Sequence, residues 1–125
     1  MVHHIRRILI LVTVLVAGIC LAPGLISAHS ILIESTPKHG ATLTAAPQNV
    51  LLRFNAKIEP GLTKVSLVNG RNHRTPLEIL GESTVDRILA RMPRLEPGVY
   101  TVVYKVLATD GHITQGSIRF TLLAS

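Results

Sequence analysis

The sequence predicts an all-β domain of about seven short strands, arranged as a two-sheet Greek-key sandwich or a small barrel. Three observations support this prediction. Apolar segments with strand-like alternation recur along residues 31–125, turn residues such as Asn-Gly and Pro-Gly separate them, and no window shows the period of an amphipathic helix. Only four aromatic residues are present, so Val, Leu and Ile are expected to form most of the core.

The first half of this domain is predicted from short apolar runs between turn signals. Strands are expected at residues 31–33, 50–54 and 62–68, with turns at Pro37–Gly40 and Pro47–Asn49. In the third strand, Thr63, Val65 and Leu67 alternate with residues 62, 64, 66 and 68, which predicts one buried face. Asn69-Gly70 follows at once and is a strong turn signal.

The second half contains the clearest strand of the chain. Shorter candidates at residues 76–80 and 85–90 are divided by Gly81-Glu82-Ser83. Residues 99–107 then alternate, with Tyr100, Val102, Tyr104 and Val106 on one face. We expect the two tyrosines to be packing residues. A polar turn at residues 109–112 ends this strand, and a last strand is expected at 117–123.

The first 28 residues have the layout of a secretory signal peptide, with a basic start, an apolar middle and a small residue before the cut. The apolar run from Ile8 to Ala22 has 15 residues, fewer than the roughly 20 that a membrane span needs. Cleavage after Ala28 would leave residues 29–125 as one exported domain, starting at His29. A retained membrane anchor is the alternative.

The composition of residues 29–125 narrows the function. Without Arg6 and Arg7, 11 of the 13 basic residues remain against 7 acidic ones, a net charge of +4. The basic residues are scattered and not interleaved with aromatics, so nucleic-acid binding is not expected. The single cysteine, Cys20, lies in the predicted signal peptide. Any metal site must therefore use His, carboxylate, amine or Met donors.

Three residues form a candidate metal site. A free His29 offers its α-amine and ring Nδ1 to one ion, a donor pair that suits Cu(II). Asp110 and His112, two apart, point to the same side of extended chain, and Gly111 between them allows tight backbone geometry. In a sandwich the start of the first strand and the turn before the last can share one end. Asp110 would bind the ion directly or hold a ligand or water around it.

The order of several short motifs resembles that of the CopC family of periplasmic copper-binding proteins. The resemblance covers residues 29–125 and is carried by the His at the expected mature start, Ser35-Thr36-Pro37, Gly40–Leu43, Ala46-Pro47, Val50–Phe54, Leu95–Val102, Thr109–His112 and Gly116–Phe120. It implies a cupredoxin-like, seven-stranded Greek-key barrel. It also implies one Cu(II) held by residues that match His29, Asp110 and His112.

The same resemblance implies a periplasmic protein that sequesters copper, confers copper resistance or delivers copper to an inner-membrane transport protein. Two departures limit it. Many members carry a carboxylate where this chain reads Asn55-Ala56-Lys57, so no ligand is assigned there. Met92 is the only methionine after Met1, so no methionine-rich Cu(I) site is expected. Once processed, the chain is expected not to span a membrane.

A binding role is expected rather than an enzymatic one, and two alternatives are weighed beside it. A copper ion held by an N-terminal His and a second His resembles the histidine brace of oxidative enzymes that attack polysaccharides. A metal-free, Ig-like interaction module needs only the strand pattern and the signal peptide. The other histidines of the domain, His39 and His73, are expected to be solvated surface residues, as are the carboxylates of Glu34 and Glu59.

Overall fold

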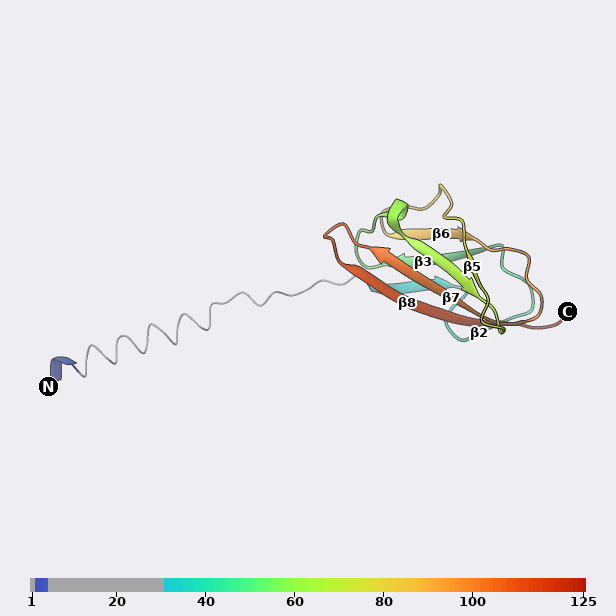
Figure 1. The fold of residues 1–125 in the computed structure, drawn as a ribbon, viewed down its shortest axis with the longest axis horizontal. Helices are drawn as coiled ribbons and strands as arrows, with labels where there is room; N and C mark the ends of the chain where they lie inside the picture. Colours follow the sequence, from blue (N-terminus) through green and yellow to red (C-terminus); the bar gives the residue numbers. More distant parts are fainter. Residues whose placement is uncertain (1, 5–30) are drawn as a thin grey trace.

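The structure is a computed structural model that describes residues 2–4 and 31–125. Residues 2–4 are helical, and residues 31–125 form a β-sandwich (Figure 1). Among these described residues, no helix is long and apolar enough to cross a membrane. Apart from residues 2–4, the predicted signal peptide lies outside the described residues, and so does His29.

The sandwich consists of two sheets rather than a closed barrel, so the open form of the predicted fold is the one observed. One sheet has the strand order β1-β3-β6 and the other the order β2-β8-β7-β4-β5. The strands are β1 (Leu32–Thr36), β2 (Ala41–Leu43), β3 (Asn49–Phe54), β4 (Lys64–Val68), β5 (Arg74–Pro76), β6 (Arg87–Arg91), β7 (Gly98–Leu107) and β8 (Ile113–Leu122). A 3-10 turn, η1 (Pro60–Leu62), precedes β4.

Three differences from the predicted strands have clear physical reasons. The sequence pattern missed β2, a three-residue strand that pairs in parallel with the end of β8. The segment predicted at 76–80 is shared between the sheets, because β5 pairs with β4 whereas Ile79 bridges to Ala90. The last strand begins at Ile113 rather than 117, because residues 113–116 continue the ladder with β7.

Gly116 explains why the start of β8 was hard to recognise. Glycine weakens a strand by propensity, and inside a strand it often marks a close approach of another group. Here Gly116 pairs with Tyr104, and a Cβ atom at position 116 would overlap the Tyr104 hydroxyl. The glycine is therefore required by the packing of the neighbouring strand.

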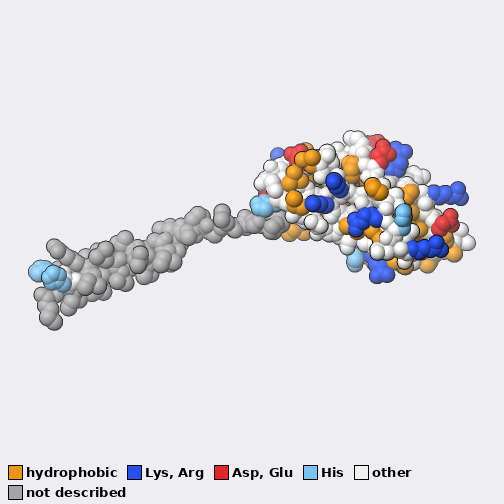
Figure 2. Space-filling view, viewed as in Figure 1, with side chains coloured by type: hydrophobic (Ala, Val, Ile, Leu, Met, Phe, Trp, Pro, Cys, Tyr) orange, Lys and Arg blue, Asp and Glu red, His pale blue; other side chains and the backbone are white. Residues whose placement is uncertain are grey.

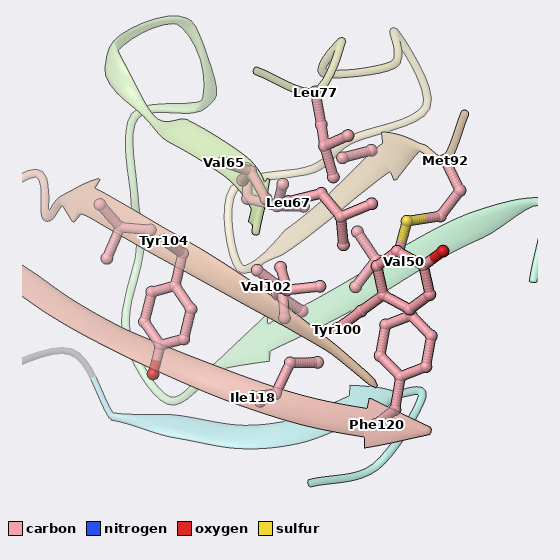
Figure 3. Packing of buried hydrophobic residues seen from close by; sticks show 14 of the residues in the cluster. Val50, Val65, Leu67, Leu77, Met92, Tyr100, Val102, Tyr104, Ile118 and Phe120 are labelled. Atoms are coloured by element: carbon pink, nitrogen blue, oxygen red, sulfur yellow. The ribbon is translucent and has the colours of Figure 1, made fainter. Parts of the chain in front are cut away.

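The core lies between the two sheets and is mostly aliphatic, as predicted. Figure 3 shows buried side chains of β4, β7 and β8, which belong to one sheet, packed with Val50 of β3 from the other sheet. The two tyrosines of β7 are packing residues: Tyr104 lies edge-on to Phe54 at 5.6 Å, and Tyr100 stacks on Phe120 at 5.5 Å. Tyr100 also donates its hydroxyl hydrogen to the carbonyl of Glu96 at 2.6 Å. Burial raises the pKa of Tyr104 above its ordinary value.

Candidate metal centre

The turn between β7 and β8 is tight and strongly hydrogen-bonded. The amide of Ala108 donates to the carbonyl of His112 at 2.8 Å, and the amide of Gly111 donates to the carbonyl of Ala108 at 2.9 Å. Gly111 has a φ of +90°, a conformation that side chains with a Cβ atom rarely adopt. The glycine therefore lets residues 109–112 reverse direction within one short turn.

Asp110 and His112 are brought together by this turn, as the sequence predicted. One carboxylate oxygen of Asp110 accepts the amide hydrogen of His112 at 3.0 Å, and the other lies 3.1 Å from His112 Nδ1. These hydrogen bonds hold the pKa of Asp110 below its ordinary value. The carboxylate is therefore ionised at neutral pH. Both side chains are about half exposed, at 46% and 47%, which leaves them accessible to an ion from solvent.

The contact with Asp110 involves Nδ1 of the His112 ring. With Nδ1 donating to the carboxylate, the neutral imidazole carries its lone pair on Nε2. Carboxylates commonly orient metal-binding histidines in this way. The geometry suits His112 as a ligand through Nε2, with Asp110 holding the ring.

A short segment after β3 connects this turn to the start of β1. At one end of the segment, the amide of Ile31 donates to Asn55 Oδ1 at 2.7 Å, and the amide of Asn55 donates to the carbonyl of Ile31 at 3.0 Å. Further on, the carbonyl of Lys57 accepts the amide hydrogen of Thr109 at 3.1 Å, and Ile58 pairs with Ala108. We call residues 55–58 the strut, because they join the two sheets at one end of the sandwich.

The strut places the first described residues of the domain beside the β7–β8 turn. In Figure 1 the start of β1 and this turn lie at the same end, opposite the C-terminus. His29 is two residues before Ile31, and two residues of chain reach at most about 7 Å. His29 itself lies outside the described residues, so its predicted role as a ligand stays a prediction.

Within residues 2–4 and 31–125, no group of three or more His, Cys, Asp or Glu side chains could hold a metal ion. The described part of the site thus supplies the pair Asp110 and His112. Further donors of the predicted centre would have to come from His29. Met92, the sole thioether of residues 31–125, is buried in the core and fills space between the sheets (Figure 3).

Of the other polar residues that the sequence singled out, Glu59 is exposed, as expected, and its amide donates to the carbonyl of Leu107 at the end of β7 at 2.8 Å. His39 is exposed, as expected, but its Nδ1 also accepts the amide hydrogen of Arg119 at 3.2 Å. His73 is exposed in the β4–β5 turn. Glu34 is not merely solvated, because it forms an ion pair with Arg53 at 2.7 Å. Figure 2 shows Lys and Arg side chains spread over the visible face without a continuous stripe.

Sequence reasoning missed Asn55. In the sequence, Asn55 stands out only as a position where an expected carboxylate is absent. In the structure, its side chain and its backbone both form hydrogen bonds with the backbone of Ile31. The one available signal was its position, a short polar residue directly after an apolar strand. That signal marks turns generally and does not reveal a partner 24 residues away.

Comparison with known proteins agrees with this fold. The family model of the CopC domain matches residues 32–123. The chain belongs to the CopC family. This chain is 31% identical to protein YobA of Escherichia coli K12 over 98 residues, which cover 76% of this chain and 79% of YobA. It is 26% identical to copper resistance protein C of Xanthomonas campestris pv. juglandis over 118 residues, covering 88% and 92%.

Two further CopC relatives differ in what they share with this chain. The copper transport protein CutJ of Bacillus subtilis is 26% identical over 98 residues, which are 76% of this chain but only 18% of CutJ. The crystal structure of CopC from Methylosinus trichosporium OB3b superposes with a TM-score of 0.70 at 28% identity, covering 76% of this chain and 94% of that one. PcoC from E. coli, at 22% identity and a TM-score of 0.63, shares the fold.

Proposed function

We propose that this CopC-family chain is an exported, periplasmic protein that binds one Cu(II) ion through His29, Asp110 and His112. The observation that carries the proposal is the strut, which ties Ile31 to the same end of the sandwich as the Asp110–His112 pair. The names of two relatives, copper resistance protein C and copper transport protein CutJ, support copper as the cargo.

In the proposed site, His29 contributes its α-amine and ring Nδ1, and His112 contributes Nε2. Three nitrogen donors with an adjacent carboxylate favour Cu(II), which prefers nitrogen and oxygen ligands in a tetragonal arrangement. Asp110 already accepts hydrogen bonds from His112, so its main role is to orient that ring and to balance the charge of the ion. With Met92 in the core, the site is proposed to be specific for Cu(II).

Delivery of copper to a partner is proposed rather than simple buffering. Exposed large apolar side chains gather around this end of the sandwich: Ile31, Leu62, Val85 and Ile113 are each more than half exposed. Ile113 pairs with Leu107 at the turn, and Val85 accepts the amide hydrogen of Ile58 in the strut. Exposed apolar side chains on several segments around a polar site favour a surface that contacts another protein. CutJ supports this, because a domain similar to this chain forms part of a longer copper transport protein.

The test is a Cu(II) titration of exported protein whose N-terminus has been verified as His29. We expect one ion per chain, with an electron paramagnetic resonance spectrum dominated by nitrogen ligands. A matched protein that keeps Ala28 converts the α-amine of His29 into an amide, which is not a basic donor. Because one of two linked donors is lost, its affinity should fall by at least about 100-fold. Equal binding by both proteins, or no binding by the first, would contradict the proposal.

A further inference from the structure

Asn55 holds the start of the domain by two hydrogen bonds of different kinds. Its side-chain oxygen accepts the amide hydrogen of Ile31 at 2.7 Å, and its own amide donates to the carbonyl of Ile31 at 3.0 Å. Both polar groups of the Ile31 backbone are therefore bound to one residue. Ile31 is itself 59% exposed, so packing contributes little to keeping it in place.

The side chain of Asn55 takes the place of a backbone acceptor at the end of a ladder. The β1–β3 register ends with the pair Leu32 and Phe54, and it is shifted between Leu32 and Glu34. In a regular antiparallel pair, the next residue of β3 would accept from Ile31 with its main-chain carbonyl. Because Oδ1 does so instead, the main chain after Asn55 can turn away and run toward Lys57 and the β7–β8 turn.

We infer that Asn55 is a positioning residue for the copper site: it fixes Ile31 and so keeps His29 within reach of His112. The inference rests on the proposed function. Without the hydrogen bonds to Asn55, Ile31 would also have to be ordered when copper binds, and the entropy of ordering it would be subtracted from the affinity. With them, that part of the cost is met on folding. Asn55 contacts the backbone of Ile31 and is not proposed as a ligand.

The test compares two asparagines, at opposite ends of the sandwich, whose side-chain oxygens accept backbone amide hydrogens. Asn69 Oδ1 accepts the amide hydrogens of Arg71 and His73, each at 3.0 Å, in the β4–β5 turn. Asn55→Ala and Asn69→Ala thus each remove side-chain to backbone hydrogen bonds from an exposed region. We expect Asn55→Ala to weaken Cu(II) affinity about tenfold, as loss of an outer-shell partner commonly does. Asn69→Ala should leave the affinity unchanged, whatever it does to thermal stability.

A second measurement on the copper-free protein makes the test independent of metal loading. Hydrogen exchange at the Ile31 amide should be faster in Asn55→Ala than in the wild type and unchanged in Asn69→Ala. Asn55→Asp keeps an oxygen acceptor and should restore both slow exchange and affinity. If wild-type protein binds copper and Asn55→Ala binds it equally well, Asn55 is not a positioning residue. If wild-type protein binds no copper while exchange at the Ile31 amide is still faster in Asn55→Ala, the proposed function fails, and Asn55 keeps only its structural role of holding Ile31.

Discussion

The β7–β8 turn and the β4–β5 turn are built alike, and only one of them is a candidate metal site. Each is organised by an Asx side chain that accepts a backbone amide hydrogen, and each presents an exposed histidine, His112 in one and His73 in the other. They differ in charge and in neighbours. Asp110 is an anion and lies near the strut that holds Ile31, whereas Asn69 is neutral and is followed by Arg71 and Arg74. Local turn chemistry alone therefore does not make a metal site.

The largest expected difference between the two turns is the effect of removing each histidine. His112→Ala should weaken Cu(II) binding by at least about 100-fold, or about 2.8 kcal/mol, because a nitrogen ligand is lost. His73→Ala should change the affinity by less than about twofold, since no donor near it belongs to the proposed site. Competition titration with a chromogenic chelator measures both. Similar losses from the two variants would show that copper binds to surface histidines in general.

A tenfold effect on Cu(II) affinity is expected when the carboxylate of Asp110 in the β7–β8 turn is replaced by a neutral amide, the group that Asn69 presents in the β4–β5 turn. Asp110→Asn keeps an oxygen that can accept the amide hydrogen of His112 but removes the negative charge beside the ring. Affinity should fall about tenfold, because the carboxylate orients the imidazole and offsets the charge of the ion. Asp86→Asn is the matched control.

Asp86 lies in the loop that meets the strut side of the sandwich, where its backbone carbonyl accepts the amide hydrogen of Phe54, and its side chain accepts a hydrogen bond from Thr84 at 3.0 Å. Removing its charge tests whether any nearby anion suffices. Equal losses from Asp86→Asn and Asp110→Asn, read from the same chelator competition, would assign the effect to general electrostatics rather than to contact with His112.

The smallest expected effect concerns the backbone of the two turns. Gly111→Ala should destabilise the copper-free protein by about 1 kcal/mol, because a φ of +90° is strained for any residue with a Cβ atom. Gly70→Ala should cost less than about 0.5 kcal/mol, since a Cβ there would meet only the Val99 carbonyl at an ordinary 3.9 Å. Urea denaturation of the copper-free variants measures both. If Gly70→Ala lowers the free energy of unfolding as much as Gly111→Ala does, backbone strain at position 111 is not the cause of the destabilisation.

Local patterns predicted the parts of the fold that depend on local chemistry. Alternation along residues 99–107 located β7 and its buried face, and the polar run at 109–112 located the turn that joins Asp110 to His112. The sequence could not show β2, because three residues acquire strand geometry only from the β8 edge beside them. It could not show the hydrogen bonds between Asn55 and Ile31 either, because the two residues are 24 positions apart in the chain.

The strut has a mechanical consequence, because it meets β1 of one sheet and the end of β7 of the other. Under the proposed coordination, a copper ion would span the same two layers and close a loop that contains most of the domain. Many exported sandwiches use a disulfide for such a cross-link, and residues 29–125 contain no cysteine. The bound copper would then also act as a reversible cross-link. Copper-free chains would open more easily at this end of the sandwich, and copper-bound chains would be the most resistant to proteolysis.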